Sequence, residues 1–106
     1  MNKPAICLLS CLLAGFPPSE TEIREALERK NELVIRGGEK LQGKDWAARM
    51  RQEAKVYSVK LTACKPEGNN AYRCAVEVDW ATALAPRHTI AMEPLVARTS
   101  QGWTVP

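Results

Sequence analysis

The chain has 106 residues, which is enough for one domain with a modest hydrophobic core and too few for several domains. Its formal net charge of +3 is too small to indicate a nucleic-acid-binding protein. No glycine-rich phosphate loop, nucleophile motif or spaced set of metal ligands is present, so we predict a non-enzymatic protein with no catalytic residues, no metal and no cofactor.

Residues 4–16 form the one strongly apolar run of the sequence, directly behind Lys3. A basic residue, about a dozen apolar or small residues and then Pro17-Pro18 are the layout of a secretory signal, and the run is shorter than the roughly 18 residues that a membrane-spanning helix needs. The sequence therefore predicts a leader over residues 1–18 and one domain over residues 19–106, with a periplasmic or secreted location.

Two other interpretations of the N-terminus stay open. The segment Leu8-Leu9-Ser10-Cys11 loosely resembles a lipobox, in which Cys11 would be acylated and would anchor the protein in the envelope. Alternatively, the apolar run is a core strand or helix that is retained in the folded domain. The chain would then be a cytoplasmic or phage-encoded interaction protein.

Two helices are expected after the leader. Ser19 to Glu22 form a capping-box pattern, apolar residues follow at helical spacing, and Gly37-Gly38 is expected to end this first helix. Its predicted buried residues are Ile23, Ala26, Leu27, Leu33 and Val34. A shorter helix is expected over residues 45–54, with Asp45 as its cap and with Trp46, Ala47 and Met50 on its buried side.

From Lys55 onward the apolar period changes to two, which is typical of strands. Residues 56–64 and 71–82 are expected to form a hairpin, followed by a strand over residues 89–98 and a short final strand with Trp103 and Val105. Pro94 should place the third strand at an edge or a bulge, since proline has no N–H for the ladder. The expected fold class is α+β, with one or two N-terminal helices packed on a four-stranded antiparallel meander.

Cys64 and Cys74 are the cysteines outside the leader, and they flank the predicted hairpin turn. A pair of cysteines in a small exported domain favours a disulfide over a zinc site, because two thiolates do not complete a tetrahedral shell and the chain has one histidine. A turn centred on Asn69 would place the two cysteines directly opposite each other. A two-residue turn at Gly68-Asn69 gives the register that matches apolar residues, and it puts the two cysteines one step out of line. We expect a bulge near Lys65-Pro66 to bring them opposite; without a bulge the thiols would stay free. That register pairs Tyr57 with Trp80, Val59 with Val78 and Leu61 with Val76.

In its strand segments 59–64, 72–78 and 102–105, placed after a helix, the chain resembles small exported bacterial proteins and lipoproteins with a cystatin-like α+β fold. The resemblance covers residues 20–106 and implies a helix packed on an antiparallel sheet. Related cone-shaped domains that resemble nuclear transport factor serve in binding, in assembly and occasionally in catalysis. The fold alone therefore does not determine which of these roles the protein has.

We predict a protein-binding or envelope-assembly module that acts through an exposed sheet edge or the 81–88 loop. The candidate partner-binding residues are Trp80, Arg87 and His88. The three tryptophans most simply supply bulk to the core; if one ring is exposed for recognition, the sequence favours Trp80. His88 is expected to be a solvated loop residue. No nucleic acid and no small molecule is expected as a partner.

The alternative function is a small-molecule binder or an isomerase that uses Asp79 with Tyr57 in a pocket between helices and sheet. In the apolar-matched register these two side chains would project to opposite faces, which argues against the isomerase.

The stretch over residues 36–55 is rich in basic residues, and we expect it to be a solvated surface. It could contact anionic lipid headgroups or an acidic partner.

Overall fold

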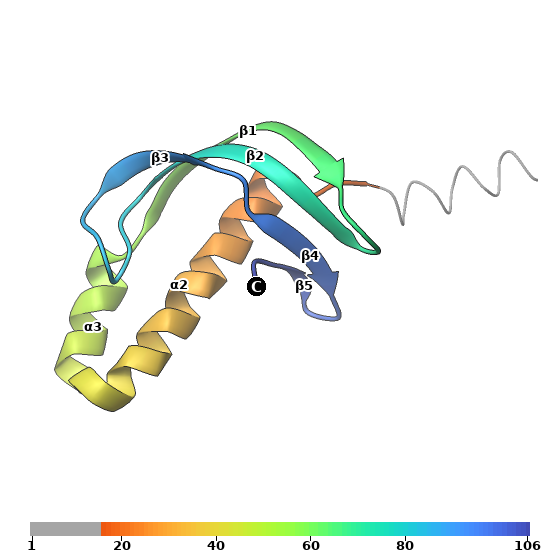
Figure 1. Ribbon diagram of the computed structural model, residues 1–106. Helices are drawn as coiled ribbons and strands as arrows, with labels where there is room; N and C mark the ends of the chain where they lie inside the picture. Colours follow the sequence, from red (N-terminus) through yellow and green to blue (C-terminus); the bar gives the residue numbers. More distant parts are fainter. Residues whose placement is uncertain (1–15) are drawn as a thin grey trace, which may run out of the picture.

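The computed structural model describes residues 16–106 (Figure 1). The acylation of Cys11 and most of the predicted leader or retained core element, residues 1–15, lie outside the described residues; of the leader over residues 1–18 the structure describes residues 16–18, of which Pro18 is fully buried. Among the described helices, none combines the length and the apolar character needed to cross a bilayer. The elements are helices α2 (Glu20–Gln42) and α3 (Lys44–Glu53) and strands β1 (Val56–Pro66), β2 (Ala71–Trp80), β3 (His88–Met92), β4 (Leu95–Thr99) and β5 (Gly102–Thr104).

Helix α2 begins as the sequence predicts. The Ser19 hydroxyl accepts a hydrogen bond from the Glu22 backbone N–H at 3.2 Å, and the Glu22 carboxylate accepts one from the Ser19 N–H at 2.9 Å. This capping box satisfies two of the N–H groups that a helix start leaves open. Pro18, directly before the cap, is fully buried and anchors the entry of the chain into the fold.

The predicted end of this helix is wrong. Helix α2 continues through Gly37-Gly38 to Gln42 and ends at Gly43, whose φ of 92° is left-handed backbone that favours glycine. Gly38 is needed inside the helix for packing, since a Cβ atom there would lie 2.4 Å from the Trp46 ring of α3. Contact between the helices therefore explains a glycine that local propensity alone would place at a helix end.

The buried face of α2 also differs from the prediction in its second half. Asn31 and Ile35 are buried, whereas Leu33 and Val34 are exposed. The face follows positions four residues apart from Ile23 onward, which is the spacing that stacks side chains on one side of a helix. The side-chain amide nitrogen of Asn31 has no hydrogen-bond partner among the residues that the structure describes.

Helix α3 starts one residue before the predicted segment. Gly43 occupies its N-cap position, so Asp45 lies in the first turn and does not act as the cap. Ala47 is buried and Trp46 and Met50 are half-buried, in line with the predicted inner side. Figure 1 shows α2 crossing beneath the sheet, with α3 packed beside its C-terminal half and both helices projecting beyond the sheet.

The sheet is antiparallel, with the order β1-β2-β4-β5. Strands β3 and β4 pair with the same edge of β2, β4 with its first half and β3 with its second half. The expected third strand is therefore two strands, and the sheet has five strands instead of four. The break falls at Glu93-Pro94, because Pro94 has no N–H to donate to the ladder. The Pro94 carbonyl still accepts a hydrogen bond from the Cys74 N–H at 3.1 Å, which keeps β3 and β4 along the same edge of β2.

The predicted disulfide between Cys64 and Cys74 is present. Val59 lies opposite Val78 and Leu61 opposite Val76, as expected from the apolar pattern. The ladder then shifts between Leu61 and Ala63 and not near Lys65-Pro66, and this shift places the two cysteines directly opposite each other.

The core lies between α2 and the concave face of the sheet. Helix α2 packs against β1 and β5, and the alternate residues of β2 point inward between them. Apolar burial of this kind is the main favourable term in folding a domain of this size. The core residues are Ile23, Leu27, Val56, Tyr72, Cys74, Val76, Val78, Val96 and Trp103.

Candidate functional site

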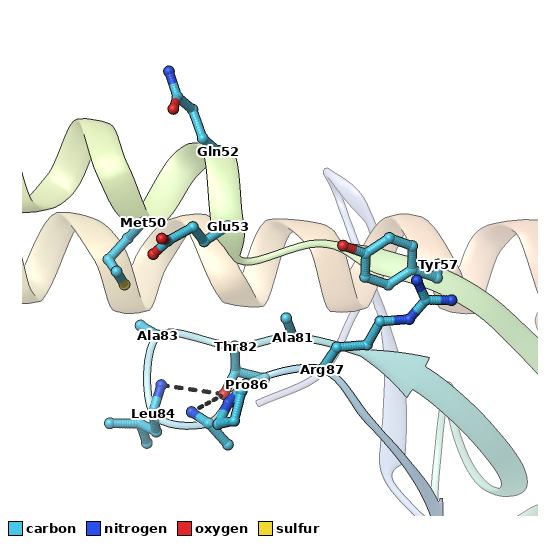
Figure 2. Close-up of a pocket in the computed structure, with 11 residues that line it drawn as sticks. Met50, Gln52, Glu53, Tyr57, Ala81, Thr82, Ala83, Leu84, Pro86 and Arg87 are labelled. Carbon is cyan, nitrogen blue, oxygen red and sulfur yellow. Dashed lines mark hydrogen bonds between the residues drawn. The ribbon is translucent and has the colours of Figure 1, made fainter.

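A groove of about 590 Å³ lies between the end of α3, the start of β1 and the loop that joins β2 to β3. Its lining includes Met50 and Glu53 from α3, Tyr57 from β1, and the loop residues 81–87. Figure 2 shows the Met50 side chain pointing from α3 toward the loop, whereas Gln52 points away from it. The groove therefore sits at one end of the sheet and not in the predicted position between helices and sheet.

The loop is held in one conformation by its own hydrogen bonds. The Thr82 hydroxyl accepts from the N–H groups of Leu84 at 3.2 Å and Ala85 at 3.1 Å (Figure 2). The Thr82 N–H donates to the Ala85 carbonyl at 2.9 Å, and the Ala81 N–H donates to the Lys55 carbonyl at 2.8 Å. A loop ordered before binding loses less conformational entropy when a partner docks.

Leu84 is the apolar residue that this loop presents to solvent. Its side chain is 90% exposed, and in Figure 2 it projects from the tip of the loop away from α3. The neighbouring loop residues are small, so nothing in the loop shields it. A single large aliphatic side chain on a hydrogen-bonded turn is suited to enter a pocket of another molecule.

Arg87, at the other end of the loop, is fixed by two neighbours. Its Nε and Nη2 donate to the two carboxylate oxygens of Asp79 at 3.1 and 2.9 Å. Its guanidinium carbon lies 3.8 Å from the centroid of the Tyr57 ring. This combination of bidentate pairing and stacking is specific to arginine, since lysine offers neither the planar fork nor the stacking face.

The expectation that Tyr57 and Asp79 project to opposite faces is wrong. Val56, and not Tyr57, lies opposite Trp80, and the ladder shifts between Val56 and Ser58. The irregularity brings Tyr57 onto the outer face, where Arg87 bridges it to Asp79. The chemistry of this cluster is ion pairing and stacking on an exposed surface.

Arg87 lowers the pKa of Asp79, mainly by hydrogen bonding to the carboxylate and also through its charge. Because the folded-state pKa is depressed, the stabilisation from this pair is present above the ordinary aspartate range and is lost as the pH falls through the lowered pKa. A lower pKa makes the Asp79 carboxylate a weaker proton acceptor, which does not favour Asp79 as a general base.

We expect the Arg87→Gln substitution to raise the pKa of Asp79 toward its ordinary range, because it removes the charged donor. A carboxyl-detected NMR titration of the full chain measures this directly. Arg73→Gln is the matched control: Arg73 holds Glu67 at 2.9 Å in a separate pair, so this variant should raise the pKa of Glu67 and leave that of Asp79 in place. An Asp79 titration that is the same in all three proteins would refute the pairing.

The structure does not bring Trp80, Arg87 and His88 to one face. Trp80 lies opposite His88 in the ladder and shares the inward face with Val78, while Arg87 reaches across the outer face. Trp80 is not the exposed ring that the recognition alternative needs, since it is half-buried and packed against the core. His88 is the half-buried first residue of β3 and pairs with Trp80, so the expectation of a solvated loop residue is wrong. Its ring Nδ1 lies 2.8 Å from the Pro86 carbonyl oxygen.

The two outer edges of this part of the sheet differ. Helix α2 occupies the β1 edge: a Glu20 carboxylate oxygen accepts from the Leu61 N–H at 2.8 Å, and Arg24 donates to the Val56 carbonyl at 3.0 Å. Strand β3 pairs with β2 alone in the described part of the chain, and Ile90 at its centre is exposed. The open edge therefore begins directly where the 81–87 loop ends.

Comparison of the chain with protein-family models, curated proteins and solved structures finds no match. Within residues 16–106 there is also no group of three or more side chains that could hold a metal ion. The candidate site is therefore inferred from the geometry of this chain alone.

Sequence reasoning located the loop and Arg87 but missed Leu84 and the role of Tyr57. A signal for Leu84 exists in the sequence, where one leucine stands among alanine, threonine and proline in a predicted loop. No comparable signal exists for Tyr57, because its placement depends on an irregularity in strand pairing.

Proposed function

We propose that the protein is an exported protein-binding or envelope-assembly module, and that the tip of the β2–β3 loop is its recognition element. The partner we infer is a protein with an apolar pocket that takes the Leu84 side chain. The observation that carries the proposal is an almost fully exposed leucine on a turn fixed by its own hydrogen bonds.

The surroundings of Leu84 support the same proposal. Tyrosine and arginine are enriched among residues that dominate binding energy at protein interfaces, and Tyr57 and Arg87 form a stacked pair beside the loop. The open edge of β3 continues the surface and can accept an added strand, which is a common mode of peptide recognition. Loop tip, stacked pair and edge would then form one interface.

The exported location and the cystatin-like resemblance belong to the proposal. A disulfide persists in oxidising compartments, so the Cys64–Cys74 bridge agrees with export. The α+β arrangement of a helix on an antiparallel sheet is compatible with the resemblance.

The alternative is a small-molecule binder that uses the groove beside the loop. Its volume of about 590 Å³ falls in the range of about 300–1,000 Å³ that ligand pockets occupy. Native mass spectrometry of the full chain purified from its own cells would reveal a stoichiometric small ligand if this alternative holds.

Site-specific photo-cross-linking in the cells that make the protein tests the proposal. A photoreactive amino acid at position 84 should give one dominant protein adduct, identified by mass spectrometry. The control is position 41, because Leu41 is similarly exposed but lies in the last turn of α2, at the opposite end of the helical hairpin from the loop. Equal labelling of the same protein from both positions, or no adduct from position 84, would contradict the proposal.

A further inference from the structure

We propose that a second surface, independent of the loop, binds anionic lipid bilayers. It lies on the C-terminal half of α2 and on the turn into α3, and we call it the hairpin face. Its residues are Lys30, Leu33, Val34, Lys40, Leu41 and Lys44.

The apolar part of the hairpin face is uncovered. Leu41 is 88% exposed and Leu33 is 62% exposed. At 3.6 residues per turn, residues eight positions apart lie roughly 80° apart, so both leucines point to the same side of α2. Gly37 lies between them, and no atom lies within 4 Å of the place where its Cβ would stand. Two exposed leucines therefore share one side of the helix.

Two acidic residues of the hairpin, Glu32 and Glu39, are paired with arginines, whereas Asp45 beside Lys44 forms no ion pair within the described residues. Arg51 of α3 binds the Glu32 carboxylate at 2.9 Å and that of Glu39 at 3.5 Å, and Arg36 binds Glu32 at 3.3 Å. These contacts lower the pKa of Glu32, chiefly through the hydrogen bond from Arg51. The Glu32 carboxylate is therefore held ionised, and Arg51 and Arg36 lie against its charge.

The lysines of the hairpin face remain available to an external anion. None of Lys30, Lys40 and Lys44 takes part in an ion pair within the described residues. Exposed leucines beside unpaired lysines on one helix face are the composition of a helix that lies in a membrane interface. Charge complementarity thus selects an anionic surface as the occupant.

The shape of the hairpin favours a bilayer over an acidic protein. Leu41 stands at the end of a hairpin that projects beyond the sheet, where α2 meets α3 (Figure 1). The nearby groove, of about 230 Å³, is lined by Leu33 but not by Leu41, so a peptide seated in it would leave the tip uncovered. A flat anionic surface can contact both leucines and the lysines together.

Vesicle binding by the full chain tests this inference. Each lysine close to an anionic bilayer contributes about fivefold in affinity, so Lys40→Glu with Lys44→Glu should weaken binding to mixed phosphatidylglycerol–phosphatidylcholine vesicles about 25-fold or more. Leu41→Ala should weaken it about fivefold, because less apolar surface enters the interface. Raising the salt concentration should release the wild-type protein.

Matched variants make the result specific. Lys60→Glu changes an exposed lysine on the sheet, and Leu84→Ala removes an equally exposed leucine from the loop; neither should change vesicle binding. Residues 1–15 are the same in every variant, so the difference in vesicle binding between the hairpin-face variants and the control variants measures the hairpin face itself.

Three outcomes would overturn the inference: equal binding to pure phosphatidylcholine vesicles, binding that persists at high salt, or equal losses in the control variants. Binding to a glutamate-rich peptide without binding to anionic vesicles would overturn it as well and would indicate an acidic protein partner.

Discussion

Removal of the Cys64–Cys74 bridge should lower the free energy of unfolding by about 3 kcal/mol. The bridge joins residues separated by 10 positions, and the entropy of closing a loop of that size in the unfolded chain accounts for most of this value. Folded domains are stable by only about 5–15 kcal/mol, so the loss is a large share of the total. The effect should exceed that of any single surface contact described above.

Urea denaturation of the full chain measures this loss. We expect the reduced wild type and the Cys64→Ala, Cys74→Ala double variant to shift together to a lower midpoint. The double variant also shows whether the reductant has any other effect, since it has no bridge to reduce. Identical midpoints for oxidised and reduced wild type would refute a stabilising bridge.

Adjacent glycines in α2 should respond to alanine with opposite signs. Gly37→Ala is expected to stabilise the protein by about 0.5–1 kcal/mol, because a helical alanine loses less backbone entropy and no atom lies within 4 Å of the new Cβ. Gly38→Ala is expected to destabilise it by about 1–2 kcal/mol, because the new Cβ would lie 2.4 Å from the Trp46 ring. The two variants differ by one position in the same helix.

Thermal or urea unfolding of both variants, with the indole N–H resonance of Trp46 in NMR spectra as a local probe, separates packing from propensity. The Gly38→Ala variant should shift this resonance and the Gly37→Ala variant should leave it in place. The Gly38→Ala, Trp46→Leu double variant should recover part of the loss, since the smaller side chain makes room. If both alanines stabilise the protein, the described contact between α2 and α3 is wrong.

Local signals in the sequence predicted much of the fold. The capping box at Ser19 and Glu22 is confirmed, because both hydrogen bonds form within four consecutive residues. The change from helical to strand period at Lys55 correctly separates helices from sheet. The cysteine pair is confirmed as a disulfide. All three signals depend on residue type and near neighbours.

Features that depend on tertiary contacts could not be predicted. Gly38 belongs inside α2 only because Trp46, eight positions later, packs over it. Pro94 was expected to weaken a strand, but its division of one strand into two depends on how β2 pairs on either side of it. The irregularities in β1 beside Tyr57 and Thr62 have no marker in the sequence.

In the candidate site, too, some features could be predicted from local sequence and others depend on tertiary contacts. A loop over residues 81–88 and the presence of Arg87 follow from the sequence, whereas the exposure of Leu84 and the stacking of Arg87 on Tyr57 follow from the fold. Trp80 is a candidate from the sequence that the fold turns away from solvent, since its place in the strand alternation directs its side chain inward. Side-chain direction at strand ends therefore decides which predicted residues can meet a partner.

The most direct test of the central claim is the affinity of the full chain for the protein identified through cross-linking at position 84. Leu84→Asp should weaken that affinity about tenfold or more, because it puts a charge into an apolar pocket. Leu41→Asp, the same change at an equally exposed leucine, should leave it unchanged. Equal affinities of the wild type and the Leu84→Asp variant would contradict the assignment of the loop as the recognition element.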